Sequence, residues 1–512
     1  MFTTGVAVGI IMGEKSLYGS EVALASLLLF VLQGIIYFFA RVFGREKIVL
    51  PVSPDRGHRN MITLVTLVAS FGIFVGVIRT QFVTPLKKYV CEDVCTLSGK
   101  IVTLPETRDG YQIFDIDPMR ETDEQMMNVR VYAPLYPLFQ VGEKLTLVGK
   151  VKEPEIIFSH DGKKTFDYVH YLSIKDVGSE IYYPKILTHE IGEISFGERL
   201  IIFNHTLTSI IATYVTDPAA SLASGMLLGN TSMSKELVST FRSAGLSHII
   251  VLSGFNIAVV VGTLLFLLKP FPIIIRVFGA SIFVVGFVIM VGGGASVIRA
   301  TLMAGISLCA LFIGRGYVAR QALIVSLFII MMYKPEVILY DVSLHLSFLA
   351  TAGIIYLTEK VQKTVDTFLS SIPLFIREIF VTTLCAYVAT LPYVMYTFGS
   401  LSLYAIVANL FIVPFVPLVM ALTFFVIVLY PISSALSHLF GFVVTLLCNG
   451  IILLARSVEK LPFASLQVSV SFTIVMLMYV FLITFYVSKS VHKKDETHET
   501  KDGEIISEIL SF

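Results

Sequence analysis

The chain contains no tryptophan and few charged residues, which make up 15% of its 512 positions. Soluble domains contain about 25% charged and about 45–50% apolar residues, whereas this chain is 55% hydrophobic with a mean hydropathy of +0.81. The composition therefore predicts an integral membrane protein. Because tryptophan is absent, any aromatic belts at the membrane surfaces must be built from its 22 Tyr and 39 Phe.

The chain has five cysteines, which are too few for a disulfide scaffold. Cys309, Cys385 and Cys448 lie in apolar stretches and are expected to pack as small hydrophobic side chains. Cys91 and Cys95 lie in the one long polar segment, where an extracytoplasmic location makes a disulfide chemically possible. Such a bridge closes a very small loop, so two free thiols remain the alternative.

Conventional catalytic signatures are missing from the sequence. It contains no Gly-rich phosphate loop, no HExxH pattern and no GxSxG elbow, and its ten histidines are scattered. We therefore expect no enzyme, no metal and no cofactor. A Ser-His intramembrane hydrolase is the alternative, since His248 and Ser253 are close in sequence. Five positions apart on a continuous helix, however, they point in different directions, and no orienting acid lies nearby.

Long apolar stretches dominate the chain, with lengths close to the ~20 residues needed to cross a bilayer. They lie near 23–42, 61–82, 246–268, 277–291, 295–312, 321–334, 343–358, 379–398, 403–429, 435–456 and 469–488. Basic residues between the first two stretches place that loop in the cytoplasm, and continued alternation places the C-terminus there too. The predicted fold is a polytopic α-helical membrane protein with about 11–12 spans, some short or broken.

A β-rich domain is predicted between the second and third of these stretches. Short runs of alternating hydrophobicity, such as CTLSGKIVTL and NVRVYA, are separated by Gly, Pro and Asp turns. This inserted, small all-β domain is extracytoplasmic in the predicted topology, and an OB-like barrel suits its length, with a small sandwich as the alternative. Residues 88–185 contain 12 basic and 16 acidic residues, a net charge of −4.

The chain is thus expected to contain five segments. They are N-terminal transmembrane helices (1–85), the extracytoplasmic OB-like β-domain (86–190), amphipathic interfacial helices (191–245), a polytopic channel domain (246–488) and a charged cytoplasmic tail (489–512).

Polar groups inside the apolar stretches are the candidate functional residues, because hydrocarbon offers them no water. The segment AGLSHIIVLSGFNIAV, at 244–259, carries the densest group. The candidate residues of a translocation pathway are His248, Ser253, Gly254, Asn256, Arg299, His345, Ser347 and Asn409.

Structural alternatives exist for several of these residues. Arg299 could extend its charge to the membrane surface, and His345 and Ser347 could bond neighbouring helices. Asn409 precedes Pro414 and Pro417, which break the helix, so its amide could satisfy a freed carbonyl. Pro392 is expected to make a similar break.

Four segments together resemble the ComEC family, the inner-membrane DNA-uptake channels of bacterial competence. In chain order they are MLLGNTSMSKELVSTFRSAGLSHIIVLSGFNIAVV, ASVIRATLMAGI, DVSLHLSFLATAGIIYL and ATLPYVMYTFGSLSLYAIVANLFIVPFVP. The preceding β-domain is similar to the OB-like domain of the same family. Each motif alone is weak, but four in the family's order are hard to obtain by chance.

The chain departs from the family pattern at two positions. Family members often carry His where this chain has Asn256, and Gln where it has His345. Both replacements keep hydrogen-bonding capacity but change the proton chemistry. Many relatives also carry a metallo-β-lactamase-like domain that this sequence lacks, so its suspected nuclease activity is not carried over.

The resemblance implies passage of single-stranded DNA across the cytoplasmic (inner) membrane of a bacterium during natural transformation. The implied partners are single-stranded DNA, membrane lipid, a separate DNA receptor, and a cytoplasmic ATP-driven motor or single-strand-binding proteins. The alternative is a transporter or flippase of another anionic or amphipathic solute, using the same broken helices. The sequence leaves the oligomeric state open.

Overall fold

The computed structural model describes residues 87–484, apart from gaps at 92, 109, 120–125, 156, 159–163, 167, 231–232, 251, 315, 317, 335, 469 and 483. The predicted spans at 23–42 and 61–82 and the tail after residue 488 lie outside the described residues. The chain divides into two compact units, one with residues 1–210 and 253–345, the other with residues 211–252 and 346–512.

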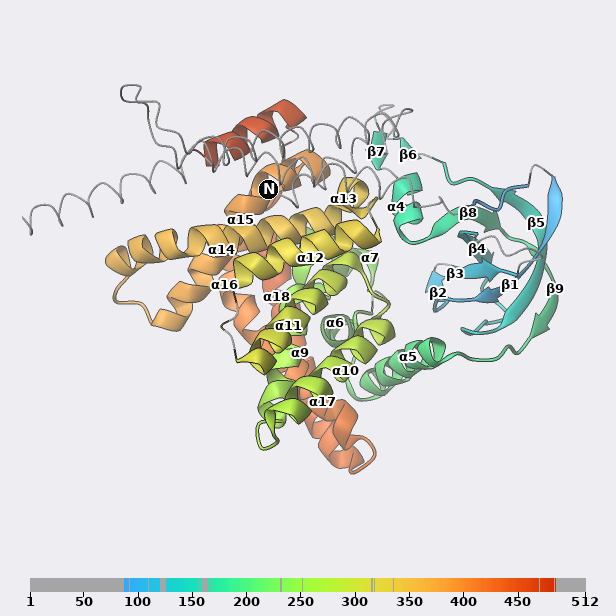
Figure 1. The fold of residues 1–512 in the computed structure, drawn as a ribbon, viewed down its shortest axis with the longest axis horizontal. Helices are drawn as coiled ribbons and strands as arrows, with labels where there is room; N and C mark the ends of the chain where they lie inside the picture. The colour runs from blue at the N-terminus through green and yellow to red at the C-terminus, as the bar shows by residue number, and fades with distance from the viewer. Residues whose placement is uncertain are drawn as a thin grey trace, which may run out of the picture. The chain divides into compact units, whose positions relative to one another are not determined.

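The β-domain lies in the first unit and contains nine strands among the described residues. They are β1 (Val94–Ile101), β2 (Glu106–Arg108), β3 (Tyr111–Pro118), β4 (Asn128–Pro134), β5 (Lys144–Lys152), β6 (Ile157–Phe158), β7 (Lys164–Phe166), β8 (Val177–Tyr182) and β9 (Lys185–Glu190). A short helix, α4 (Tyr168–Ile174), precedes β8 and packs beside it (Figure 1).

Five of these strands close into a barrel. The hydrogen-bonded order is β1-β3-β4-β8-β5, and β5 pairs back with β1 from Val94 opposite Lys150 to Lys100 opposite Lys144. Only the β4–β8 pair in this ring is parallel. A five-stranded Greek-key barrel of this kind is the OB architecture, so the prediction of an OB-like barrel is confirmed.

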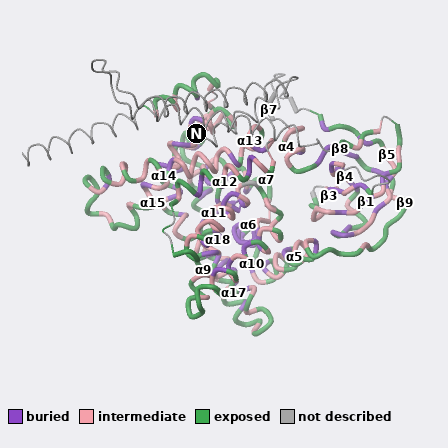
Figure 2. Tube along the Cα trace, viewed as in Figure 1, coloured by how far each residue is buried: buried purple, intermediate pink, exposed green. Residues whose placement is uncertain are grey.

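Alternating burial explains why these sequences form barrel strands. Along β4, Val129, Val131 and Ala133 are fully buried, while the residues between them face outward. The inward side chains form one core with Leu97, Ile101, Phe114, Ile116, Phe139, Leu145, Leu147, Val151 and Ile181. Figure 2 shows buried stretches along the barrel strands in purple. The barrel therefore has its own hydrophobic core, built from the alternation that predicted it.

The other helices belong to the helical part of the chain. They are α5 (Phe196–Tyr214), α6 (Ala219–Leu228), α7 (Lys235–Ser243), α8 (Ser247–Ile250), α9 (Gly254–Leu267), α10 (Ile273–Val291), α11 (Ala295–Ile313), α12 (Ala319–Tyr333), α13 (Val337–Tyr340), α14 (Val342–Phe368), α15 (Leu374–Phe398), α16 (Ala405–Ile412), η1 (Val413–Phe415), α17 (Val416–Leu429) and α18 (Ser434–Glu459). Two short strands that pair with each other, β10 (Ser400–Leu401) and β11 (Leu466–Gln467), and a further apolar helix, Phe472–Leu482, are also described.

Six described helical stretches are long and apolar enough to cross a membrane. They are Ile273–Val291, Ser296–Ile313, Val342–Phe368, Leu374–Phe398, Ala405–Leu429 and Ser434–Glu459, and shorter apolar helices include α9 and α12. The chain is therefore a polytopic helical membrane protein that carries a small β-barrel domain.

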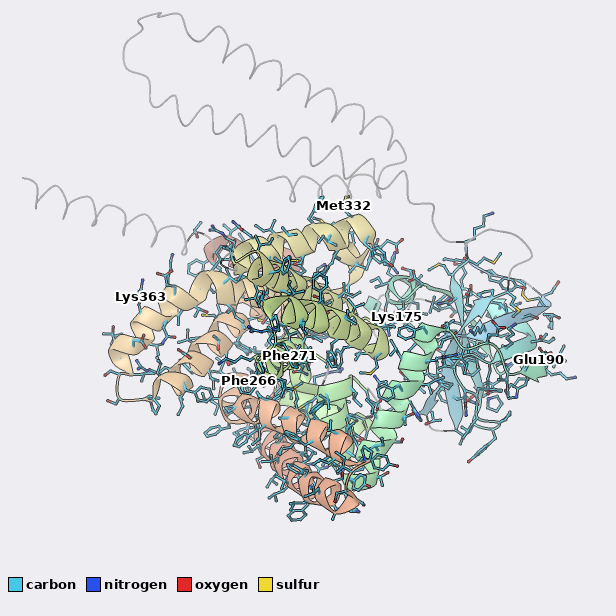
Figure 3. The ribbon with its side chains drawn as sticks, turned by 60° about the horizontal axis from the view of Figure 1, so that its bottom comes forward. Lys175, Glu190, Phe266, Phe271, Met332 and Lys363 are labelled. Carbon is cyan, nitrogen blue, oxygen red and sulfur yellow. A yellow bond between two sulfur atoms is a disulfide. The ribbon has the colours of Figure 1, made fainter. Side chains whose placement is uncertain are left out.

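Helix α14 is longer than the predicted stretch at 343–358. Its 27 residues extend about 40 Å, which exceeds the roughly 30 Å of hydrocarbon in a bilayer. The extra turns carry an ion pair between Glu359 and Lys363 at 2.7 Å, and the Lys363 side chain projects from them (Figure 3). Charged side chains at this spacing support the helix beyond the apolar stretch.

The predicted helix breaks were right at one proline motif and wrong at another. Between α16 and α17, Pro414 lies in the 3₁₀ turn η1 and Pro417 in the first turn of α17, so the helix changes there as expected. Pro392, in contrast, is buried inside α15, which continues to Phe398. Apolar membrane helices tolerate an internal proline when neighbouring groups re-satisfy the backbone, so the predicted break at Pro392 was wrong.

A capping box fixes the start of α5, the expected amphipathic helix. Ser195 precedes the helix, and Glu198 lies in its first turn. The Glu198 N–H donates to the Ser195 Oγ at 3.3 Å, and the Ser195 N–H donates to the Glu198 Oε2 at 2.7 Å. Lys100 of β1 donates to the same Glu198 oxygen at 2.7 Å and to the Glu193 carbonyl at 2.6 Å. One carboxylate thus caps α5 and attaches it to the barrel.

This shared carboxylate makes a pH-dependent contribution to stability. Burial by itself raises the pKa of Glu198, but hydrogen bonds from Lys100 and Ser195 outweigh it and lower the pKa below its usual value. A carboxyl with a depressed folded pKa stabilises above its unfolded pKa, and that contribution is lost as the pH falls through the folded pKa.

We expect Lys100→Met to destabilise the protein by about 1–2 kcal/mol at pH 7, because a charge-assisted hydrogen bond is lost. The difference from wild type should shrink as the pH falls below the ordinary glutamate pKa of about 4.3 and through the lower folded pKa of Glu198. Thermal unfolding in detergent, at pH 7 and at the lower pH, measures the difference in stability. Lys150→Met, at an exposed position on β5, is the control. An equal loss at both pH values contradicts this account.

Candidate translocation site

The predicted span at 246–268 is divided into two helices. The four-residue α8 ends at Ile250 and α9 begins at Gly254, with Ser253 in extended conformation at φ −104° and ψ 166°. In α8 the polar Ser247 and His248 are exposed, whereas Ile249 and Ile250 are buried. The predicted span at 246–268 is therefore not one continuous helix, and it is interrupted at its polar residues.

Four candidate residues, all in the first unit, come together at the start of α9. Ser253 Oγ donates to the Asn256 Oδ1 at 3.2 Å, and Asn256 is 2% exposed. Arg299 of α11 extends its guanidinium to Gly254, because a Cβ placed on that glycine would lie 2.7 Å from Arg299 Nη2. Ser253, Gly254, Asn256 and Arg299 are hereafter the α9 cluster.

The α9 cluster concentrates positive charge within the helical part of the chain. Arg299 is only 6% exposed, and its Nη1 donates to the Met303 Sδ, a weak acceptor, at 3.2 Å. The first turn of α9 has no acidic residue and no side-chain cap, so its N–H groups present the positive end of the helix dipole. A guanidinium beside a helix N-terminus is an arrangement that attracts an anion.

His345 lies in the same unit but in a different bonding arrangement. Its Nε2 contacts the Ile338 carbonyl oxygen of α13 at 2.5 Å, and Asp341 Oδ1 caps α14 by accepting from the Leu344 N–H at 3.0 Å. This contact joins the consecutive helices α13 and α14. It matches the alternative in which His345 bonds a neighbouring helix.

The remaining candidate residues, His248, Ser347 and Asn409, belong to the second unit. The Ser347 carbonyl accepts from the Thr351 hydroxyl at 2.8 Å. Asn409 is 7% exposed in α16, and its Oδ1 accepts no hydrogen bond from the described residues. Four of the eight predicted pathway residues therefore lie together in the α9 cluster, and the other four lie outside it.

A second polar cluster lies on the outer face of the barrel, across β4, β8 and α4. Tyr132 and Tyr182 are register partners on the parallel pair, and their rings stack with centroids 4.5 Å apart and planes 7° apart. Glu180, which is 3% exposed, accepts hydrogen bonds from Tyr132 and Tyr168 at 2.9 Å and from Tyr182 at 2.8 Å. We call Tyr132, Tyr168, Glu180 and Tyr182 the tyrosine face.

These hydrogen bonds hold the tyrosine face rigid. Burial, together with hydrogen bonds and the charge of Glu180, raises the pKa of Tyr132 and of Tyr182 well above 10. The hydroxyls therefore remain protonated and keep donating to the carboxylate at physiological pH. Beside them, Arg130 binds Asp115 with two hydrogen bonds of 2.8 and 3.0 Å, so both charges are compensated.

The tyrosine face was not among the site residues predicted from the sequence. Alternation along β8 puts Glu180 and Tyr182 on one face, but the pairing of β8 with β4 is a long-range contact that no local pattern contains.

Cys91 and Cys95 are joined by a disulfide, with Cα atoms 6.5 Å apart. Among the described residues, no group of three or more His, Cys, Asp or Glu is arranged to hold a metal ion.

The fold and the α9 cluster define a polytopic membrane protein with an OB-like barrel and a buried cationic site at a broken helix. The family model described as "Competence protein" matches residues 226–491, just over half of the chain. The chain belongs to this family.

A curated relative is similar to a large part of the chain. ComE operon protein 3 of Bacillus subtilis (strain 168) is 21% identical over 324 residues, which cover 59% of this chain and 40% of the relative. The match thus spans less than half of that protein's length. No solved structure matches the chain.

Gly254 tests the geometry of the α9 cluster. Because the atom nearest to an added Cβ is the flexible end of Arg299, we expect Gly254→Ala to fold with a change in unfolding free energy below about 1 kcal/mol. The guanidinium must move, however, so the transport proposed below should fall at least about tenfold, the equivalent of about 1.4 kcal/mol. Thermal unfolding and a transport assay measure the two effects.

Gly262→Ala, in the same helix, is the matched control, since no atom lies within 4 Å of an added Cβ there. It should keep full transport. Wild-type transport in Gly254→Ala would show that the position of Arg299 does not matter.

Proposed function

We propose that the chain forms a channel through which single-stranded DNA crosses the cytoplasmic membrane during natural transformation. The observation that carries this proposal is the α9 cluster, in which Arg299 and the start of α9 converge within the helical part of the chain. A cation buried in a membrane costs about 3 kcal/mol, and a passing phosphodiester offsets that cost. Membership of the Competence protein family supports the same substrate.

The remaining candidate residues, His248, Ser347 and Asn409, are proposed to line the same route, together with His345. Their hydroxyl, imidazole and amide groups can bond phosphate or sugar without adding a fixed charge. Weak, replaceable contacts suit a conduit, because a strand that binds too tightly does not leave.

The barrel is proposed to receive the strand on its extracytoplasmic side. The disulfide between Cys91 and Cys95 supports this placement, since such bonds persist in oxidising compartments. Strands β3 and β4 correspond to the face on which OB folds bind oligonucleotides, and the tyrosine face lies beside them. The net charge of −4 over residues 88–185 favours recognition by base stacking over a phosphate funnel.

The channel itself has no recognisable means of hydrolysing ATP. We propose that a cytoplasmic ATP-driven motor or single-strand-binding proteins pull or trap the strand, and that a separate receptor delivers it. Transport of another anionic or amphipathic solute is the second candidate function, because the α9 cluster attracts any phosphate-bearing group.

Uptake of labelled DNA tests the proposal directly. In a transformable strain from which this gene is deleted, the wild-type chain should restore uptake, and Arg299→Ala should lower it about tenfold to a hundredfold. That range corresponds to the loss of one charge-assisted hydrogen bond. Arg299→Lys should recover part of the activity, and the exposed Lys363→Ala should retain all of it, at equal membrane levels.

Uptake that is unchanged on deletion of the gene overturns the DNA proposal and leaves the other solutes. Full uptake with Arg299→Ala and Asn256→Ala, with uptake lost on deletion, instead removes the α9 cluster as the site.

Binding of a single-stranded oligonucleotide tests the barrel. Tyr182 is 53% exposed, and Tyr182→Ala should weaken binding by the full-length protein about fivefold to a hundredfold, the worth of one stacked base. Tyr182→Phe should keep the affinity, because the ring remains. Tyr136→Ala, at an exposed position elsewhere on the barrel, is the control.

Stacking also predicts a weak salt dependence. Between 50 and 200 mM salt the affinity should fall far less than the roughly thousandfold typical of phosphate-dominated binding. A steep salt slope with no effect of Tyr182→Ala contradicts the proposed role of the tyrosine face.

A further inference from the structure

The short helix α4 uses two of its faces for packing within the first unit. On one face Leu172 is fully buried, and α4 packs beside β8 of the barrel. On a second face the Ile174 carbonyl accepts from the Lys334 ammonium at 2.7 Å, and the rings of His170 and Tyr340 stack with centroids 3.8 Å apart. These contacts join the barrel to the helices of the same unit and leave a third face of α4 open.

The third face of α4 continues the tyrosine face. Tyr168, Tyr171 and Lys175 follow one another at spacings of three and four residues, which place them on one side of the helix. The rings of Tyr168 and Tyr171 are nearly parallel, with an angle of 24° between planes and 6.3 Å between centroids. Tyr171 and Lys175 are exposed, and the Lys175 Nζ lies 4.7 Å from the centroid of the Tyr171 ring. We call Tyr168, Tyr171 and Lys175 the α4 stripe; Tyr168 belongs to both surfaces.

Lys175 supplies a positive charge that the tyrosine face lacks. Two other cations of this region are compensated, because Arg130 binds Asp115 and Lys334 binds Asp176 at 2.6 Å. Lys175 forms no ion pair with a carboxylate of the described residues, and its ammonium lies over an aromatic ring instead. A cation–π contact at an exposed site is weaker than a charge-assisted hydrogen bond to a phosphate. An arriving phosphate therefore draws Lys175 off the ring and uncovers the ring for a base.

The α4 stripe lies where the barrel meets the helices of its own unit. Figure 1 shows α4 between the barrel strands and α13, and the contacts with Lys334 and Tyr340 fix it to the end of α12 and to α13. Helix α14 follows α13 directly and carries His345, one of the candidate pathway residues. A strand that leaves the tyrosine face along the stripe therefore reaches the helical part of the chain.

We propose that the α4 stripe is a second nucleotide-binding position, which takes a single strand from the tyrosine face and passes it toward the membrane helices. One base stacks on the ring of Tyr171, and Lys175 binds the adjacent phosphate. Stacking tolerates any base, because every base has a π-face. The inference rests on the proposed function, since it takes the ligand to be single-stranded DNA, and it connects two parts of the chain that the proposed function left unconnected.

Oligonucleotide length tests the second position. The full-length protein in detergent is titrated with fluorescent strands of about 4 and about 16 nucleotides, the limits of the site sizes known for one OB fold. The long strand covers both positions, whereas the short strand can bind at the tyrosine face alone. Tyr171→Ala should weaken binding of the long strand about fivefold to a hundredfold, the worth of one stacked base, and should leave binding of the short strand nearly unchanged. Tyr171→Phe should bind both strands as wild type does, because the ring remains.

Salt dependence tests the lysine. Lys175→Gln should reduce the slope of log K against log salt concentration for the long strand by about 0.7, the effect of one phosphate contact on a single strand. Lys144→Gln, at the end of β5 away from its pairing with β8, is the matched control and should keep the wild-type slope. Tyr182→Ala should lower the affinity without changing the slope, because it removes a ring and no charge.

The outcomes separate this inference from the proposed function. Equal losses for the two lengths in Tyr171→Ala, or an unchanged slope in Lys175→Gln, overturn the α4 stripe. If Tyr182→Ala weakens binding while Tyr171→Ala and Lys175→Gln bind the long strand as wild type does, the tyrosine face stands and the α4 stripe alone fails. If the wild-type protein binds neither strand, the proposed role of the barrel fails together with the stripe.

Discussion

Hydrocarbon provides no hydrogen-bond partner and poorly solvates charge, and the rest of this structure follows from that constraint. Most of the chain is apolar helix that satisfies its own backbone, and the few polar residues inside it must be held by protein or by a transported group. The α9 cluster is where this demand is greatest, because a buried guanidinium and an uncapped helix N-terminus meet there.

In the proposed function, the barrel and the helical part of the chain contact nucleic acid through different interactions. The barrel carries a net negative charge over residues 88–185 and presents aromatic rings held by a buried carboxylate, which suits bases more than phosphates. The helical part has little charge but places Arg299 where a phosphate would pass. The proposed function therefore assigns contacts with the bases to the barrel and contacts with the phosphate backbone to the helical part.

Much of the fold could be predicted from the sequence because its signals are local. Apolar length marked the spans, and alternation marked the barrel strands. The polar residues of AGLSHIIVLSGFNIAV marked a candidate site within a span, and the structure shows that the helix is broken there. The predicted stretches at 277–291 and 295–312 correspond to α10 and α11, which meet at three glycines; Gly292 has a φ of 87° and Gly294 is the N-cap of α11. Patterns of this kind depend on residues close together in the sequence and need no long-range contact.

What the sequence could not show depends on long-range contacts. The approach of Arg299 to Gly254 requires α11 to pack on α9, and the tyrosine face requires β8 to pair with β4 across 48 residues from Tyr132 to Glu180. The helix continues through Pro392, and whether neighbouring groups re-satisfy the backbone at a proline is a matter of packing that the local sequence does not contain. The capping box at Ser195 and Glu198 was local and readable, but it was overlooked.

The most direct test of the central claim is the water accessibility of the α9 cluster and its protection by DNA. In membranes with Ser253→Cys, and with Cys309, Cys385 and Cys448 replaced by alanine, the rate of labelling by a charged, membrane-impermeant thiol reagent is measured with and without a single-stranded oligonucleotide. The account predicts that the thiol reacts and that the oligonucleotide slows its reaction severalfold. A thiol that does not react, or that reacts at the same rate with DNA present, contradicts the claim that the strand passes the broken helix.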